Sequence, residues 1–389
     1  MSEIKVNSIK GTGASTAAIT VNSSDGTCTA NITNNLGHKN IVINGDMRIA
    51  QRGTSYTSSG YHTVDRFKYT YSGTDNAPTQ SQSDIAAGTT PYTLGFRKAY
   101  KITNANQSSG AGSGDRIRLE VNLEAQDIAN SGWNYLSSSS FITLSFWCKS
   151  SVAQNFYASI RTPDGTSQNY SFETGSLTAD TWTKVTKTIP GNSNLTFDNN
   201  AELGWNMEIA MFMGTNDTSS GNTMNQWAAH DGSNEMPDNT STWYTTNGAT
   251  WEITGMQLEV GSVATDFEHR SIGDEQKKCY RYFQRLTSSD NYQWVSLVAF
   301  YADTEIHGFL KHFETMRAVP TLSVTTGSNT FAVQRAGGAV SWSTGIVKNG
   351  GDANMTYFYR DGVTLGTSGQ CGRCLTWTAG STITLESEL

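Results

Sequence analysis

Charged residues make up only 16% of this 389-residue chain, and no apolar run approaches the length that spans a bilayer. Long solvated helices, which need Glu, Lys, Ala and Leu, are therefore not expected. The formal net charge is −7, and Lys and Arg do not cluster. Because nucleic-acid binding requires cations gathered on one face, we expect neither a nucleic-acid partner nor insertion into a membrane.

A secretory leader is not expected either. The first residues, Met1-Ser2-Glu3-Ile4-Lys5, contain no apolar signal-peptide core. We therefore expect the protein to be made in a cytoplasm and to stay there or leave by cell lysis as part of a particle.

Cysteines are few, odd in number and scattered, at Cys28, Cys148, Cys279, Cys371 and Cys374. Such a set does not resemble a secreted disulfide framework. Cys371 and Cys374 have zinc-knuckle spacing, but tetrahedral zinc needs four ligands and the sequence has no second pair. We interpret them as two nearby thiols in a turn, and no cofactor is expected.

Because charged and aliphatic residues are few, small polar residues make up much of the composition. Ser, Thr and Asn are abundant, and the chain has 37 Gly and 10 Trp, with aromatic residues at 11%. Thr and aromatic residues favour strands, whereas Gly and Asn favour turns. The composition predicts an all-β protein with enough large apolar side chains to build real cores.

Residues 1–36 stand apart from the rest. They contain no aromatic residue, and apolar and polar residues alternate over 4–9 and 18–22, which indicates short strands. A segment this small cannot bury a core of its own, so its strands must pack on another domain or on other copies. We predict an attachment and oligomerisation segment, although an unstructured tail would have a similar composition.

Residues 37–270 are predicted to form a jelly-roll β-sandwich. Alternating or continuously apolar stretches, separated by Gly- and Ser-rich turns and without helices between them, are typical of this fold. Residues 215–250 are rich in Asn, Thr and Ser and are expected to be a functional or mobile loop. The predicted strands are 40–44, 116–121, 141–148, 181–189, 205–213 and 251–260.

A connector helix is predicted within 271–290, because Ser271 and Asp274 form a capping-box pattern and Cys279, Phe283 and Leu286 then share a face. Residues 291–389 are predicted to form a small C-terminal β-sandwich. Its strand-like stretches are 293–301, 305–310, 321–324, 356–359 and 381–386.

Several stretches resemble one known family. Asn40-Ile41-Val42-Ile43-Asn44-Gly45-Asp46-Met47-Arg48-Ile49-Ala50-Gln51-Arg52-Gly53, followed by Val64-Asp65-Arg66-Phe67, resembles the opening of a domain found in tail-fibre proteins of bacteriophages, including marine phages and cyanophages. Ile253-Thr254-Gly255-Met256-Gln257-Leu258-Glu259-Val260-Gly261 and Ala264-Thr265-Asp266-Phe267-Glu268-His269-Arg270 resemble its end. Met316-Arg317-Ala318-Val319-Pro320-Thr321-Leu322 is also similar to these fibres.

The resemblance implies a structural protein of the virion, usually a trimer when it is a fibre, with a jelly roll similar to carbohydrate-binding modules. Its implied partners are other copies, other virion proteins bound through residues 1–36, and a glycan or protein receptor on the host cell. Related jelly rolls often hold a structural Ca²⁺ where the first and last strands meet. Asp46 matches the first-strand position, but Thr254-Gly255 replaces the acidic pair expected in the last strand.

The polar residues of the opening motif are assigned structural roles. Asn44-Gly45 fits a turn that demands positive φ. Arg48, Arg52 and Arg66 lie near Asp46 and Asp65 in the sequence and are expected to form ion pairs that hold the first strand to the last.

Candidate sugar-binding residues are the aromatics in loops, since a pyranose ring stacks on a π-system while polar side chains bind its hydroxyls. Each of these side chains either stacks on a sugar or anchors its loop in the core, where aromatics lie on average. Trp147, Trp182, Trp205 and Trp251 fall in predicted strands and are interpreted as core. The candidates are Trp133, Tyr135, Trp227, Trp243 and Tyr244.

Motifs of common enzyme classes are missing, including the nucleophile elbow, the phosphate loop and the paired-histidine zinc motif. We therefore predict a non-enzymatic tail-fibre subunit that mediates adhesion to the host surface. A capsid decoration or head-fibre protein is the first alternative. The second is a glycan-degrading tailspike, which would need two carboxylates facing a groove.

Overall fold

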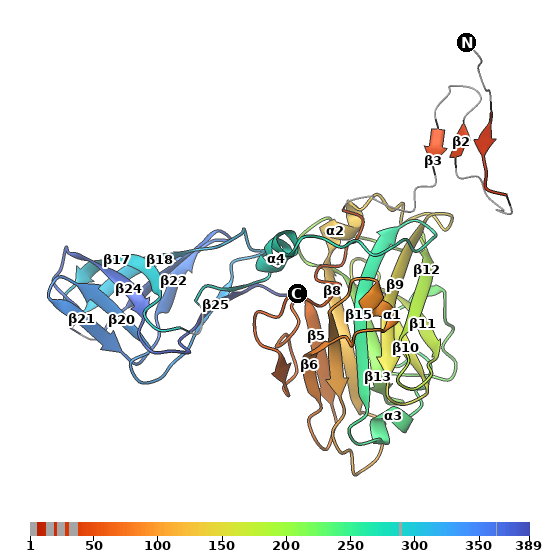
Figure 1. Ribbon diagram of the computed structural model, residues 1–389, viewed down its shortest axis with the longest axis horizontal. Helices are drawn as coiled ribbons and strands as arrows, with labels where there is room; N and C mark the ends of the chain where they lie inside the picture. The colour runs from red at the N-terminus through yellow and green to blue at the C-terminus, as the bar shows by residue number, and fades with distance from the viewer. Residues whose placement is uncertain (1–5, 13–18, 22–27, 31–37, 288–289, 363) are drawn as a thin grey trace.

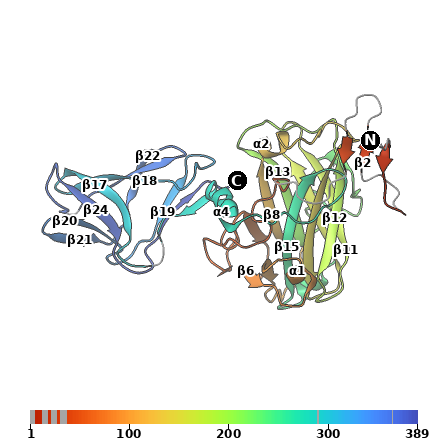
Figure 2. The same ribbon diagram turned by 45° about the horizontal axis from the view of Figure 1, so that its top comes forward.

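The computed structural model describes residues 6–12, 19–21, 28–30, 38–287, 290–362 and 364–389. A small N-terminal sheet leads into a large β-sandwich, and helix α4 (Ile272–Tyr280) connects this sandwich to a second β-unit (Figures 1 and 2). The predicted all-β class with a jelly-roll body is confirmed.

Two six-stranded antiparallel sheets face each other in the jelly roll. We name them after their longest strands, the β13 sheet and the β15 sheet. In spatial order the β13 sheet contains β14 (Trp227–Ala229), β11 (Gln168–Ser176), β10 (Asn155–Thr162), β13 (Leu203–Met213), β8 (Arg116–Glu124) and β5 (Phe67–Ser72). The β15 sheet contains β12 (Thr183–Pro190), β9 (Phe141–Ser150), β15 (Thr250–Val260), β7 (Lys98–Thr103), β6 (Thr79–Asp84) and β4 (Ser55–Tyr56).

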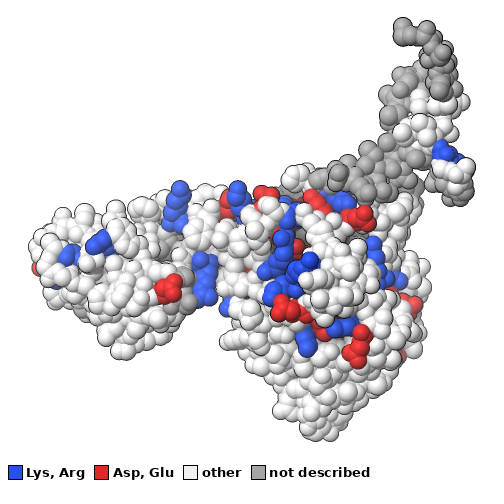
Figure 3. Space-filling view, viewed as in Figure 1, with Lys and Arg blue, Asp and Glu red and all other residues white. Residues whose placement is uncertain are grey.

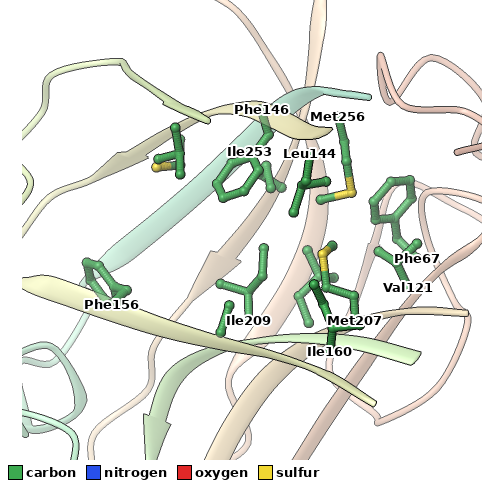
Figure 4. Packing of buried hydrophobic residues seen from close by; sticks show 14 of the residues in the cluster. Phe67, Val121, Leu144, Phe146, Phe156, Ile160, Met207, Ile209, Ile253 and Met256 are labelled. Carbon is green, nitrogen blue, oxygen red and sulfur yellow. The ribbon is translucent and has the colours of Figure 1, made fainter. Parts of the chain in front are cut away.

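Alternate residues of these strands fill the space between the sheets. Leu144 and Phe146 of β9 and Ile253 of β15 point toward Met207 and Ile209 of β13 (Figure 4). All five are at most 2% exposed. Burying side chains of this size contributes about 1.5–3 kcal/mol each, so the paired sheets are the main source of stability in this unit. Three short helices lie in its loops, α1 (Thr90–Thr93), α2 (Ala125–Ala129) and α3 (Thr242–Thr245).

The strong strand predictions in the jelly roll correspond to β8, β9, β12, β13 and β15. The strand predicted at 40–44 is wrong, because these residues form a turn. The Asn40 side chain accepts a hydrogen bond from the Val42 N–H at 3.0 Å, and Asn44 has φ of 59°. Local bonding of this kind competes with a strand ladder.

The connector is shorter than predicted. Ser271 caps α4 by accepting a hydrogen bond from the Asp274 N–H at 3.1 Å, as the capping pattern indicates. The helix ends at Tyr280, so Phe283 and Leu286 do not continue its face. Phe283 belongs instead to strand β16 (Phe283–Arg285), which pairs with the strand nearest the C-terminal end of the chain.

The C-terminal unit is a smaller sandwich of a seven-stranded and a three-stranded sheet, confirming the predicted fold of this region. The larger sheet contains β21 (Gly338–Trp342), β20 (Phe331–Arg335), β24 (Cys371–Thr376), β17 (Trp294–Ala302), β18 (Glu305–Lys311), β23 (Met355–Arg360) and β22 (Val347–Gly351). The smaller sheet contains β16 (Phe283–Arg285), β25 (Ile383–Glu386) and β19 (Thr321–Val324).

The cysteine pair of this unit lies in a strand rather than in the predicted turn. Cys371 and Cys374 are both in β24, where Cys371 is exposed and Cys374 is buried. Residues three apart on a strand point to opposite faces, so the two thiols do not form a joint site.

At the other end of the chain, β1 (Ser8–Ile9), β2 (Ile19–Val21) and β3 (Cys28–Ala30) form a three-stranded antiparallel sheet. Parts of the strands predicted at 4–9 and 18–22 lie outside the described residues. Val6 and Ile9 are 45% and 53% exposed. The attachment role of residues 1–36 stays a prediction. Within the described chain, no helix is both long and apolar enough to cross a membrane.

Candidate functional site

Two stretches of the opening and closing motifs pack against each other in the jelly roll. The Asn40 side chain donates to the Met256 carbonyl at 3.0 Å and accepts from the Leu258 N–H at 3.1 Å. The Gly45 carbonyl accepts from the Met256 N–H at 2.9 Å. A Cβ on Gly45 would overlap the Met256 carbonyl, so this close approach requires glycine.

Asn44 is the centre of the turn that follows. Its backbone has φ of 59°, as the sequence indicated for this turn. Its side chain donates to the carbonyls of Ile49 and Asp65, both at 2.9 Å, and accepts from the Ile49 N–H at 3.0 Å. One amide thus satisfies three buried backbone groups, which explains Asn at this position.

The motif arginines do not all act as expected. Arg48 pairs with Asp46 and donates to the Arg270 carbonyl at 2.8 Å, which does tie the opening motif to the segment after β15. Arg52 lies 3.9 Å from Asp65 but only 3.0 Å from Glu388.

Arg66 also pairs with Glu388, so the expected pinning of first strand to last is wrong for Arg52 and Arg66. Both hold the jelly roll to the end of the C-terminal unit instead. Burial raises the pKa of Asp65 to about 6, although the Arg52 guanidinium opposes the shift. The partner Glu388 was out of reach of sequence reasoning, because it lies 322 positions from Arg66.

The donor set near Asp46 does not fit calcium. Ca²⁺ takes six or more oxygens. One Asp46 oxygen contacts Arg48, and the other, Oδ1, is buried without a hydrogen-bond partner. No group of three or more His, Cys, Asp or Glu that could hold a metal occurs among the described residues.

Three of the five loop aromatics are core side chains. Trp133, Trp243 and Tyr244 are 3%, 0% and 1% exposed. The Trp243 indole donates to the Thr250 carbonyl at 3.1 Å, and the Tyr244 hydroxyl donates to Asp115 at 2.9 Å. The expectation that these rings are open to sugars is wrong, because they anchor their loops between the sheets.

The other two candidates are half-buried. Tyr135 meets Phe197 edge-on at 4.9 Å between ring centroids. Trp227 donates to the Pro190 carbonyl at 2.7 Å and lines an open groove of about 430 Å³ with polar neighbours such as Gln168. Trp227 therefore packs against the core and also lines a groove.

A better-formed pocket lies on the outward face of the β15 sheet. The pairing of β15 with β9 shifts register between Thr254 and Gln257, which marks a bulge. Gly255 has φ of 64° there, and a Cβ on it would lie 2.6 Å from the Phe96 ring. A bulge bends its strand and re-aims the neighbouring side chains, and here it forms the floor of the pocket.

This pocket, which we call the bulge pocket, has a volume of about 220 Å³ and is lined by Leu94, Phe96, Ser145, Trp147, Lys184, Gly255, Thr265, Asp266, Phe267 and His269. The Phe267 ring lies 4.9 Å from Phe96 and 5.0 Å from His269 between centroids. A His269 ring nitrogen lies 2.9 Å from the Leu94 carbonyl oxygen, which orients the imidazole.

Trp147 was expected in the core, and this is wrong. Its neighbours Phe146 and Cys148 are fully buried, whereas Trp147 is half-exposed on the opposite face of β9. Trp182 is half-exposed as well, with the Lys149 ammonium 5.2 Å from its ring centroid. The sequence did contain a signal for this position, because strict alternation along 141–148 places Ser145 and Trp147 together on the outward face of the strand.

The chemistry of the bulge pocket suits a small polar ring. Trp147 and Phe267 line it with aromatic rings, and Lys184, Ser145 and His269 bring a cation, a hydroxyl and an imidazole to the same space. Concave sites with an apolar wall and a few convergent polar groups are typical of small-molecule binding.

No protein-family model matches the chain, and no curated protein sequence matches it. Among solved structures, the chain is similar to the enzymatically active domain of tailspike protein 4 from bacteriophage CBA120, with 11% identity and a TM-score of 0.30 over 57% of this chain. It spans only 21% of that domain's chain.

Two other solved structures are similar at about the same level. A putative sugar-binding protein from Bacteroides thetaiotaomicron has 12% identity and a TM-score of 0.30, covering 57% of this chain and 100% of its own. The N-terminal cellulose-binding domain of a Cellulomonas fimi β-1,4-glucanase has 11% identity and a TM-score of 0.26, covering 56% and 99%. Similarities this low carry no argument about function.

Proposed function

We propose that the chain is a subunit of a bacteriophage tail fibre that binds glycans of the host cell surface without cleaving them. The observation that carries the proposal is the bulge pocket. Its floor and one wall are Gly255, Thr265, Asp266, Phe267 and His269, which belong to the closing motif that resembles phage fibres. The closing motif therefore packs against the opening segment and also lines a pocket with aromatic and polar residues.

Adhesion through such a small pocket depends on several copies acting together. Weak contacts at each copy become firm when several engage one surface. The exposed apolar residues Val6 and Ile9 in the N-terminal segment support its packing on other copies or on other virion proteins. A homotrimer, as in fibres, is part of the proposal.

A second exposed surface supports oligomerisation or host contact. Leu297 and Tyr301 of β17, Phe309 of β18 and Tyr357 of β23 are 65%, 72%, 47% and 52% exposed. We call this surface of the seven-stranded sheet the β17 face. Few charged side chains show on the C-terminal unit in Figure 3, whereas many gather over the jelly roll. Contiguous exposed apolar patches mark interaction sites.

The rival function is a glycan-cleaving enzyme, because such enzymes use two carboxylates and the jelly roll contains a pair of neighbouring glutamates. Glu120 of β8 and Glu208 of β13 are register partners, and burial raises the pKa of Glu208 to about 7. Both contact the Arg118 guanidinium, at 3.1 Å and 2.7 Å, which supports a structural role for the pair. Release of reducing sugar from host polysaccharide, lost in Glu208→Gln, would favour the enzyme.

The test of the proposal is binding of the purified protein to a printed array of bacterial surface glycans. We expect Trp147→Ala to weaken the pocket-bound glycans by about tenfold or more, because stacking and burial of one sugar face are lost. Trp182→Ala is the matched control, a half-exposed Trp on the same sheet face that does not line the pocket. Equal binding by wild type and Trp147→Ala would contradict the assignment. Labelled antibody on intact particles distinguishes a tail fibre from a capsid decoration.

A further inference from the structure

A larger cleft lies where the jelly roll meets the small sheet of the C-terminal unit. It measures about 590 Å³ and is lined by Gln51, Arg52, Gly60, Tyr61, His62, Phe283, Arg285, Ser323, Thr382, Thr384 and Glu386. It shares no residue with the bulge pocket. In Figure 1 the end of β25 runs toward the jelly roll, so one wall comes from each unit.

The floor of this junction cleft is one face of β25. Ile383 and Leu385 are fully buried, so the alternate side chains Thr382, Thr384 and Glu386 face the cleft. Thr384 is the register partner of Arg285 on β16 and of Ser323 on β19. Arg285 adds a guanidinium on one side of Thr384, and Ser323 adds a hydroxyl on the other. The floor is therefore a strip of hydroxyl, carboxylate and guanidinium groups.

The facing wall is aromatic. Tyr61 and His62 come from the jelly-roll segment, and the ring of Tyr56 stacks on His62 at 4.3 Å between centroids. Arg52 also lines the cleft, with its guanidinium 3.6 Å from the Phe283 ring centroid. The cleft is thus lined by the aromatic rings of Tyr61 and His62 from the jelly roll and by the hydrogen-bonding groups of the C-terminal unit.

Charge and topology narrow the ligand class. Arg52 and Arg285 are the cations of the cleft lining, and two carboxylates accompany them, Glu388 at 3.0 Å and Glu386 at 3.5 Å from the Arg52 guanidinium. The cleft therefore lacks the cluster of cations that a polyanion would need. β25 is already paired on both sides, with β16 and β19, so the floor offers no free strand edge to an extended peptide. A volume of about 300–1,000 Å³ is usual for small-molecule sites.

We propose that the junction cleft binds a short neutral oligosaccharide. Its hydroxyls would contact Thr384, Ser323 and Glu386, and one ring face would lie on His62. The choice of carbohydrate rests on the proposed function, whereas the site itself is independent of the bulge pocket. Because both units contribute walls, the bound sugar also bridges them and stabilises their junction.

The experiment measures binding of cellotriose, maltotriose and chitotriose to the full chain by calorimetry and by saturation-transfer NMR. Binding of the full chain to the same glycan array is measured in parallel. We expect Glu386→Gln and Thr384→Val each to lower the affinity of a cleft ligand about tenfold. Thr384→Val removes a hydroxyl that hydrogen-bonds the sugar, and Glu386→Gln removes the charge that strengthens such a bond. Trp147→Ala leaves that affinity unchanged. Glu314→Gln and Thr186→Val are matched controls, because both are exposed residues outside the cleft.

The outcomes separate this inference from the proposed function. Binding that depends on Trp147 but not on Glu386 or Thr384 overturns the cleft and leaves the adhesive function standing. Binding that depends on the cleft residues alone supports the inference and overturns the bulge pocket as the site. If no glycan binds, both fall. Thermal unfolding of each variant, with melting temperatures near that of wild type, shows that lost binding is not lost folding.

Discussion

Arg66 and Glu388 form a buried ion pair although they lie 322 positions apart in the chain. Their side chains are 3% and 5% exposed. Arg66 also lies flat on Tyr282, with its guanidinium carbon 3.4 Å from the ring centroid. Glu388 therefore holds the end of the C-terminal unit against the first strands of the jelly roll.

Glu388→Ala should lower the free energy of unfolding by about 3–5 kcal/mol, because it leaves two buried guanidinium groups, Arg52 and Arg66, short of their partner. Urea unfolding followed by tryptophan fluorescence measures the change. Glu202→Ala is the control, since Glu202 pairs with Arg317 but its side chain is 72% exposed. That substitution should cost at most about 1 kcal/mol. Similar losses for both variants would contradict a special role of Glu388.

Gly255→Ala should destabilise the protein and close the bulge pocket. Gly255 has φ of 64°, and an added methyl group would lie 2.6 Å from the Phe96 ring, so backbone strain and overpacking combine. Overpacking alone typically costs about 1–3 kcal/mol.

Gly248→Ala separates the two effects. Gly248 has φ of 74°, but an added Cβ would meet nothing within 4 Å. It should therefore show the strain cost alone, about 1 kcal/mol, with glycan binding unchanged. Thermal unfolding and array binding of both variants are the measurements, and equal effects of the two would exclude the contact with Phe96 as a cause.

The strands of both sandwiches could be predicted because their local pattern and their environment agree. Along β9, Leu144, Phe146 and Cys148 alternate with outward residues, and the same period governs β25. The opening motif misled the same reasoning, because Ile41 to Ile43 has the residues of a strand. Instead, the Asn40 side chain accepts a hydrogen bond from the Val42 N–H, and the Asn44 side chain donates to the Ile49 carbonyl across the turn that follows.

The candidate sites were harder to predict because they depend on which face of an element is covered. Trp243 and Tyr244 lie in a polar loop, yet the structure places both rings between the sheets. Trp147 lies in an apolar strand, yet its ring is on the outer face. The junction cleft joins His62 to Glu386, which only the tertiary contacts bring together.

Stability should fall as the pH rises from about 4.5 to about 7, in part through Glu208. Burial raises the pKa of this carboxyl from 4.5 to about 7; Arg118 opposes the rise and Glu120 adds to it. Between these two pH values the folded state binds a proton that the unfolded state has released. The free energy of unfolding is therefore highest below the unfolded pKa and declines until the folded carboxyl has ionised.

Glu208→Gln should flatten this pH dependence by up to about 1.4 kcal/mol per pH unit, the value for one proton. Urea unfolding at pH 5, 6 and 7 measures the slope. Asp84→Asn is the control, because the Asp84 side chain is 82% exposed. An unchanged slope in Glu208→Gln would assign the dependence to other groups, of which Asp65 is the first to test.

Deleting residues 1–36 should weaken self-association and leave the two β-units folded. The described strands β1 to β3 pair only with one another, and none of the described residues of this segment belongs to the cores of the jelly roll and C-terminal unit. Light scattering should find a trimer for the full chain and a smaller mass for the truncated chain at equal concentration. A monomer in both cases would remove the fibre model for the isolated chain.

The β17 face should take part in the same assembly. The three aromatic side chains on it, at about 150–250 Å² each when fully buried and about half to three quarters exposed, leave roughly 260–430 Å² of surface open, which would supply about a third to a half of the roughly 800 Å² per partner of a stable interface. Leu297→Asn with Tyr301→Asn should lower the mass in solution, whereas Val263→Asn, at a residue 60% exposed outside this face, should not.

Cys371 provides an independent measure of whether the β17 face is covered. Its thiol is exposed, and it is the register partner of Ala299 in β17. In a Cys28→Ser background, a thiol reagent should label Cys371 slowly in the oligomer and quickly in the Leu297→Asn, Tyr301→Asn variant. Fast labelling in both, with the oligomer intact, would place the β17 face on the outside of the assembly, where it is free to contact the host.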